Sequence, residues 1–258
     1  MTPADRIEEA IAGAKRERRP AIAAYLTAGY PSQGRFAEAL EQVESAAELV
    51  EIGVPFSDPM ADGVTIQRSS RRALEAGTTL EAILAQLAGH GTTRPPRLLM
   101  SYLNPLLAFG FEALATAALR GGVCGFIVPD LPLEESGPLR DALDPHGIAL
   151  VQLVSPVTPP DRALRLCRAS RGFVYAVTMT GTTGGSASAP SDVLGYLDRV
   201  RAASPLPVLA GFGIRRPDQV RALSAHVDGV VVGSALIEAL DRGEDLREFL
   251  GALRGPTT

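Results

Sequence analysis

Three residue types that often carry enzyme chemistry are scarce in this 258-residue chain, which has one lysine, three histidines and two cysteines. The lysine, Lys15, lies in a stretch expected to form the first helix, so no lysine is placed to form a Schiff base. Cys124 and Cys167 do not form a close pair, which favours reduced, buried thiols over a disulfide framework and a cytosolic location.

Long apolar runs and basic runs are also missing. No apolar stretch reaches the 18–20 or so residues that a membrane-spanning helix needs, so no membrane span is expected. Residues 1–20 are charged without a continuous apolar core, which argues against a signal peptide. The formal net charge is −4, and the basic cluster at residues 15–19 is interpreted as a solvated helix end, so we do not expect nucleic acid as a partner.

What the chain does contain is a regular alternation of apolar runs and helical patterns. After an amphipathic helix predicted at residues 2–18, apolar runs occur at 21–29, 47–54, 97–103, 124–130, 148–156, 172–179, 206–213 and 227–234. Helical patterns follow them at about 34–46, 64–76 with 79–89, 109–120, 135–144, 160–169, 190–203, 217–224 and 235–252.

This alternation predicts the fold. Continuous rather than alternating apolar runs indicate strands covered on both faces, as in a parallel sheet. Eight strand–helix units in about 250 residues predict an α/β fold, a (β/α)8 TIM barrel with an extra N-terminal helix, and a single domain over residues 1–258. The alternative, a doubly wound open sheet, would need an early glycine-rich turn, whereas the first strand leads into "TAGYPS".

In such a barrel, catalytic groups occur at the carboxyl ends of the strands. His90, His146 and His226 each precede a predicted strand, so they belong to the opposite end. No zinc, haem or dinucleotide motif occurs either, and no metal site is expected. Carboxylates and tyrosines remain for acid–base chemistry.

Two carboxylates stand out in "VEIGVPFSDPMADGVTIQ", residues 50–67. Glu51 lies near the end of the second strand between Val50 and Ile52, and burial there should raise its pKa towards neutrality. The alternative is that Glu51 forms an ion pair with an arginine inside the barrel. Asp62, in the following loop, is either a second catalytic acid or a turn residue.

Four other features allow two interpretations each. Asp58 and Asp130 either take part in the site or have a structural role in turns. Glycine-rich junctions follow the last two strands, at Gly211 and Gly213 and at Gly233 before Ser234, where barrels commonly bind phosphate; glycine is also frequent in plain turns. The glycine-rich stretch 178–191 is interpreted as a lid over the site, or as a loop without a role.

At this point the motifs resemble a known family. "VEIGVPFSDPMADGVTIQ", "YLTAGYP", "MSYLNPLLAFG", "FIVPDLPLEES", "GTTGG", "GFGI" and "VVGSAL", in this order, closely resemble the tryptophan synthase alpha chain. The resemblance implies a lyase that cleaves indole-3-glycerol phosphate to indole and glyceraldehyde 3-phosphate without a cofactor of its own. It also implies an allosteric beta partner that carries pyridoxal phosphate, in an alpha-beta-beta-alpha heterotetramer.

The resemblance also assigns residues. It implies catalytic roles for Glu51 and Asp62; phosphate binding by Gly184, Gly213, Gly233 and Ser234; pocket positions at Tyr25, Tyr102, Pro129 and Tyr175; a lid threonine at Thr183; and a partner interface at Pro55, Asp58, Asn104 and Pro105. The lid departs from the usual family pattern, because Met179, Thr182 and Ser186 stand in it and no arginine follows it until Arg199.

Three alternatives to a synthase subunit stay open. A stand-alone lyase would release free indole, and the altered lid is compatible with that. A catalytically idle paralogue would only activate a beta chain, although both acids are intact. A phosphosugar isomerase on the same fold would need a comparable acid–base set without an indole-sized pocket.

Overall fold

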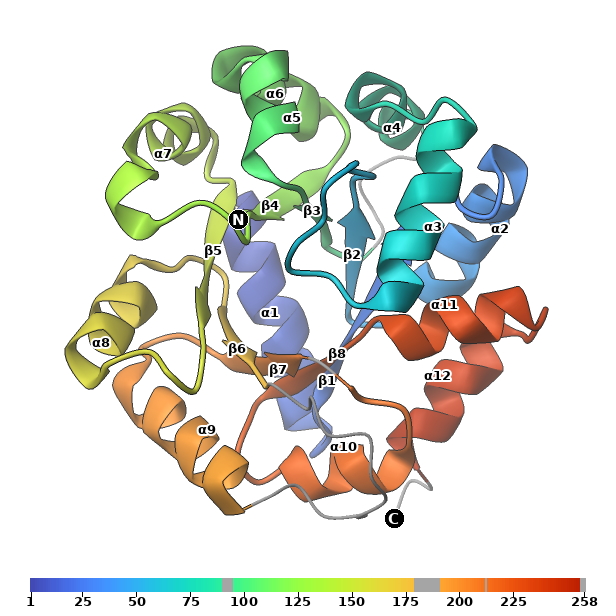
Figure 1. Cartoon of the computed structure of the whole chain (residues 1–258). Helices are drawn as coiled ribbons and strands as arrows, with labels where there is room; N and C mark the ends of the chain where they lie inside the picture. The colour runs from blue at the N-terminus through green and yellow to red at the C-terminus, as the bar shows by residue number, and fades with distance from the viewer. Residues whose placement is uncertain (90–94, 179–190, 212, 256–258) are drawn as a thin grey trace.

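The strands of the computed structural model, which describes residues 1–89, 95–178, 191–211 and 213–255, close into a parallel barrel in sequence order (Figure 1). The predicted barrel is therefore confirmed. Its strands are β1 (Ala21–Thr27), β2 (Leu49–Gly53), β3 (Arg97–Met100), β4 (Val123–Ile127), β5 (Ala149–Val154), β6 (Val174–Val177), β7 (Val208–Gly211) and β8 (Gly229–Val232).

Helices surround the barrel in Figure 1 and cover its outer face. They are α2 (Gln33–Glu44), α3 (Val64–Glu75), α4 (Leu80–Ala88), α5 (Leu103–Phe109), α6 (Phe111–Arg120), α7 (Gly137–Leu143), α8 (Pro160–Ala169), α9 (Ser191–Ala203), α10 (Pro217–Leu223), α11 (Ser234–Asp241) and α12 (Leu246–Arg254), with 3-10 turns η1 (Leu133–Glu135) and η2 (Asp144–His146). No helix within these described segments is long and apolar enough to cross a membrane.

The strands are buried on both faces, which explains their unbroken apolar sequences. In β1, Ala21 and Ala23 belong to the cluster inside the barrel, whereas Ile22, Ala24 and Leu26 pack in the layer between barrel and helices. Because strand side chains alternate, a residue at the carboxyl end of a strand points either into the barrel mouth or into the helix layer.

The extra N-terminal helix, α1 (Pro3–Arg16), closes the amino end of the barrel. It crosses behind the barrel in Figure 1, and its buried stripe includes Ile7 and Ile11. A capping box starts the helix, since the Asp5 backbone N–H donates to Thr2 Oγ1 (3.2 Å) and the Thr2 N–H donates to Asp5 Oδ2 (2.7 Å). With this end closed, the other end is left for the site.

Candidate active site

The two carboxylates singled out in the sequence both lie at the open end of the barrel. Glu51 is in β2, where it pairs in register with Tyr25 of β1, and it is 2% exposed. Asp62 is half-buried in the loop between β2 and α3, which passes in front of the barrel in Figure 1.

The Glu51 carboxyl is held in its neutral form near pH 7. Burial, and secondarily the negative charge of Asp62, raise its pKa to about 8. Glu51 Oε2 has no hydrogen-bond partner among the described residues. No ion pair in the described part of the chain involves Glu51, so the alternative of an arginine partner finds no support.

Asp62 has a different environment. Burial raises its pKa to about 6, and a hydrogen bond from Tyr102 lowers it. The Tyr102 hydroxyl donates to Asp62 Oδ2 over 3.3 Å and accepts from the Ala61 backbone N–H over 2.8 Å. At pH 7 this carboxyl is mostly ionised while Glu51 is mostly protonated, so the two acids can act in different protonation states.

The loop that carries Asp62 is fixed at several points. The ring of Phe56 stacks on that of Tyr102 with centroids 5.0 Å apart. Ser70 of α3 accepts from the Phe56 N–H over 2.8 Å and donates to the Phe56 carbonyl over 3.1 Å. Gln67 Nε2 donates to the Asp62 carbonyl over 2.8 Å. The loop is therefore built to present one carboxylate in one place.

Two buried tyrosines line the barrel interior beside the acids. Burial raises the pKa of both Tyr25 and Tyr175 well above the usual value, and the neighbouring carboxylates raise it further, so both phenols stay neutral. Glycines leave room for them: a Cβ on Gly53 would lie 2.1 Å from Tyr25 Oη, and one on Gly211 would lie 2.2 Å from Tyr175 Oη. A glycine inside a strand signals such a close approach, but the sequence did not indicate which ring fills the space.

The described residues expected to bind phosphate follow the ends of two neighbouring strands. Gly211 of β7 pairs with Val231 of β8, and Gly213 and Gly233 each come two residues later, beyond the strand ends. Gly233 is the N-cap of α11 and Ser234 is its first residue, so backbone N–H groups and the positive end of the helix dipole are available there. Gly184 and Thr183, the other phosphate and lid predictions, lie outside the described residues.

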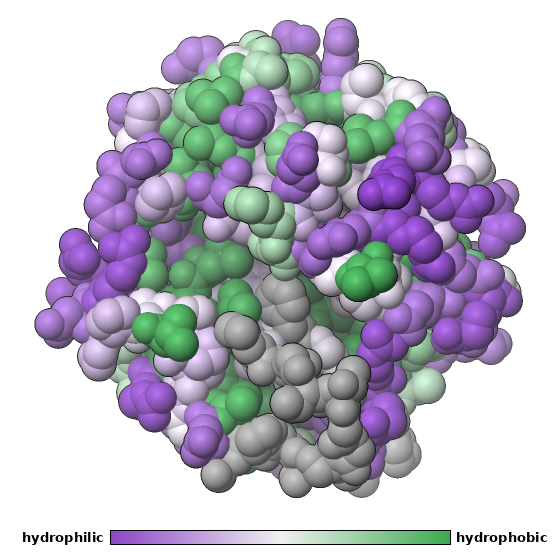
Figure 2. Space-filling model, in the orientation of Figure 1, coloured by the Kyte–Doolittle hydropathy of each residue, from purple (hydrophilic) through white to green (hydrophobic). Residues whose placement is uncertain are grey.

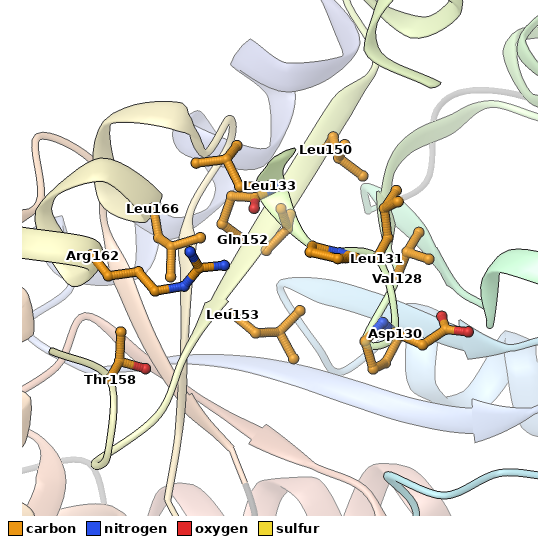
Figure 3. A pocket seen from close by; sticks show the side chains of 13 residues that line it. Val128, Asp130, Leu131, Leu133, Leu150, Gln152, Leu153, Thr158, Arg162 and Leu166 are labelled. Atoms are coloured by element: carbon orange, nitrogen blue, oxygen red, sulfur yellow. The ribbon is translucent and has the colours of Figure 1, made fainter. Parts of the chain in front are cut away.

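The remaining pocket residue, Pro129, lines a separate cavity. This cavity of about 310 Å³ lies between the segment after β4 and the start of α8, and its lining includes Gln152 and Arg162 but neither Glu51 nor Asp62 (Figure 3). Asp130, also in its lining, accepts from the Leu103 N–H over 2.9 Å, which ties the loop after β4 to the loop after β3.

The predicted partner interface is partly exposed. Asp58 and Asn104 are exposed and Pro105 is half-buried, whereas Pro55 is buried and offers little surface. Large exposed apolar side chains lie near these residues in the chain: Met60, Val64 and Leu107. Apolar residues also appear among polar ones on the barrel face seen in Figure 2.

His146, His226 and both cysteines stay apart from this end, and His90 lies outside the described residues. His146 lies in η2 just before β5, and His226 lies just before β8, paired with Asp198 (2.7 Å). Cys124 and Cys167 are buried free thiols. Among the described residues, no three His, Cys, Asp or Glu side chains are grouped to hold a metal.

Comparisons with known proteins agree with this arrangement. The family model described as "Tryptophan synthase alpha chain" matches residues 11–252. A tryptophan synthase alpha chain of Desulfovibrio desulfuricans is 46% identical over 248 residues, covering 95% of this chain and 97% of that protein. One from Caulobacter sp. is 44% identical, covering 95% of this chain and 90% of that protein.

Solved structures give the same result. A chain of Mycobacterium tuberculosis tryptophan synthase, in its aminoacrylate-bound form, superposes with a TM-score of 0.87 at 33% identity, covering 96% of this chain and 98% of that one. The tryptophan synthase subunit alpha of Legionella pneumophila gives 0.86 at 31% identity, covering 98% and 97%. The chain belongs to the tryptophan synthase alpha chain family.

Proposed function

We propose that this chain is the lyase subunit of a tryptophan synthase, which cleaves indole-3-glycerol phosphate to indole and glyceraldehyde 3-phosphate. The observation that carries the proposal is the pair of carboxylates in one barrel mouth, with pKa values of about 8 for Glu51 and about 6 for Asp62. This is the arrangement that a cleavage by proton transfers alone requires, and it uses no lysine.

The reaction is a retro-aldol cleavage in which the indole ring accepts the electrons. Protonated Glu51 donates its proton to indole C3, and positive charge develops at the ring nitrogen, whose N–H faces ionised Asp62. The Glu51 carboxylate then takes the proton from the side-chain hydroxyl next to C3. The carbon–carbon bond breaks, its electron pair restores the aromatic ring, and the hydroxyl carbon becomes the aldehyde. Glu51 ends protonated, as it began.

The substrate phosphate is assigned to the other side of the mouth. The N–H groups at the start of α11, with Gly213, Gly233, the Ser234 hydroxyl and Gly184, would hold it. Tyr25, Tyr102, Pro129 and Tyr175 would line the pocket and Thr183 would belong to the lid. The tyrosines stay neutral, which suits contact with an uncharged ring.

The partner in this proposal is a tryptophan synthase beta chain, which receives the indole. Pyridoxal phosphate belongs to that partner, and this chain needs no cofactor. Asp58, Asn104 and Pro105 would contact the partner, with Pro55 supporting the loop. An alpha-beta-beta-alpha heterotetramer, a cytosolic location and a single domain over residues 1–258 complete the proposal.

The direct test is indole release from indole-3-glycerol phosphate by the purified chain, with and without an added beta chain. Slow release that rises strongly with the partner supports the synthase subunit. Fast release that ignores the partner indicates a stand-alone lyase. No release in either case contradicts the lyase assignment and leaves a non-catalytic paralogue or another substrate.

A further inference from the structure

A hydrogen-bonded bridge joins three segments that are far apart in the sequence. Thr65 Oγ1 donates to Glu238 Oε1 over 3.1 Å. Arg215 donates to the same carboxylate from two nitrogens, from Nη1 to Oε2 over 2.5 Å and from Nη2 to Oε1 over 3.0 Å. Thr65 lies in α3, Glu238 in α11 and Arg215 in the loop after β7, so one carboxylate connects all three segments.

Each member of this bridge lies close to a residue of the proposed site. Thr65 is three residues after Asp62, and Arg215 is two residues after Gly213. Glu238 is four residues after Ser234 in the same helix, which is a rise of about 6 Å, or one turn. The bridge therefore starts at the phosphate side and ends at the carboxylate side.

A packing contact between the same helices supports this connection. α3 and α11 lie side by side (Figure 1). A Cβ built on Gly233 would lie 3.6 Å from Ile66 Cδ1, so the first turn of α3 packs against the turn assigned to phosphate. A shift of that turn would therefore move the segment that follows Asp62.

We propose that Thr65, Glu238 and Arg215 are positioning residues that transmit phosphate binding to Asp62. The inference rests on the proposed function. A bound phosphate fixes the start of α11 and the loop after β7, these fix the Glu238 carboxylate, and Glu238 fixes Thr65. A bound phosphate thereby holds Asp62 more firmly in place for the indole nitrogen.

The bridge adds little to overall stability, which makes it testable. The side chains of Arg215 and Glu238 are 48% and 30% exposed, and ion pairs with that exposure contribute little to stability because solvent screens them. Positioning has larger effects, since a displacement of about 1 Å at a reacting group can cost up to about 100-fold in rate.

The first test compares Thr65→Val, which removes the donor at nearly constant shape, with Thr65→Ser, which keeps it. We expect Thr65→Val to lower kcat about tenfold with KM changed less than about twofold, and Thr65→Ser to stay near wild type. The matched control is Arg68→Gln, because Arg68 contacts Asp241 and so joins the same two helices one turn farther from Asp62.

Two kinetic results would contradict the proposed positioning role of the bridge. Equal kcat values for Thr65→Val and Thr65→Ser would show that the hydroxyl does not matter. An equal loss in Arg68→Gln would show that only the pairing of α3 with α11 matters, not the contact near Asp62.

The second test does not depend on turnover. Hydrogen exchange is measured with and without saturating inorganic phosphate, and in wild type we expect slower exchange at residues 233–236 and also at 61–66. In Thr65→Val, phosphate should slow exchange at residues 233–236 but no longer at 61–66. If phosphate protects 61–66 in a wild type that releases no indole, the bridge stands and the proposed function fails. If turnover is normal but 61–66 never respond, the bridge fails alone.

Discussion

At the scale of single residues, Glu51 couples folding to pH. Its pKa rises from an ordinary 4.5 to about 8 on folding, so the folded chain keeps a proton that the unfolded chain releases between these values. Stability is therefore highest below about pH 4.5 with respect to this group and falls as pH rises to about 8. Each pKa unit corresponds to about 1.4 kcal/mol, so several kcal/mol are involved.

Glu51→Gln should remove this dependence because the amide does not titrate. We expect its free energy of unfolding, relative to that of wild type, to increase as pH rises from about 5 to 8, because only wild type loses stability over this range. Urea denaturation at several pH values measures the difference. Parallel curves for the two proteins would show that the Glu51 pKa is not raised.

The two carboxylates together predict the pH profile of kcat/KM. Activity needs Asp62 ionised and Glu51 protonated, so the profile should be a bell with limbs near pH 6 and pH 8. The limbs belong to the pair, since the two groups interact. Asp62→Asn should remove the acid limb and move the alkaline limb to lower pH, because one cause of the raised Glu51 pKa is gone. Glu51→Gln should lower kcat/KM about 100- to 10,000-fold, because it removes the group that transfers the protons.

The sequence predicted single site residues unevenly. Glu51 could be recognised because a carboxylate inside a strand buried on both faces has few structural uses. The hydrogen bond from Tyr102 to Asp62 could not be recognised, since it joins two loops 40 residues apart. The same holds for the bridge through Glu238, whose partners lie in two other segments.

At the scale of strands and helices, the sequence predicted the elements but extended the strands. The predicted runs exceed the observed strands at one or both ends, as with 47–54 against Leu49–Gly53. Apolar side chains continue beyond the hydrogen-bonded ladder because residues that flank the strands are still buried, as Val54 and Val128 are. Hydrophobicity reports burial and does not mark where pairing stops.

Two helix predictions were incomplete for a local reason. The predicted helix 109–120 is preceded by α5 (Leu103–Phe109), whereas the sequence pattern predicts the end of a strand and a loop there. The predicted helix 235–252 is two helices, separated at Gly243, which has a left-handed φ of 73°, and restarted by the N-cap Asp245. Both signals are present in the sequence, but the apolar periodicity runs across them.

The strand glycine beside Tyr25 gives a prediction at this scale. Gly53→Ala places a Cβ 2.1 Å from Tyr25 Oη, so the ring must move, which should destabilise the fold by about 1–3 kcal/mol and reduce turnover. Gly251→Ala is the control, since its Cβ meets nothing within 4 Å in α12, and alanine there should stabilise by up to about 1 kcal/mol.

A double mutant tests the cause of that loss. In a Tyr25→Leu background the far end of the ring is absent, so Gly53→Ala should cost clearly less free energy of unfolding than in wild type. Additive losses in the double mutant would place the effect elsewhere than in the ring contact.

At the scale of the whole molecule, the two ends of the barrel have different tasks. The amino end is closed by α1, whose Ile7 and Ile11 are almost fully buried. The carboxyl end holds both acids, the start of α11 and the exposed residues around the mouth. A partner that receives a product from this site should therefore dock at the carboxyl end.

Leu107 lies on that surface, because α5 follows β3 directly at the carboxyl end, and its side chain is 52% exposed. A charge buried against a partner costs free energy, so Leu107→Glu should weaken stimulation by a beta chain about tenfold or more while leaving indole release by the isolated chain unchanged.

Leu119→Glu is the matched control: Leu119 is 43% exposed near the end of α6, which precedes β4 at the opposite end. A titration of each variant with the beta chain measures the effect. Equal loss in both variants, or loss only in Leu119→Glu, would place the docking surface away from the barrel mouth.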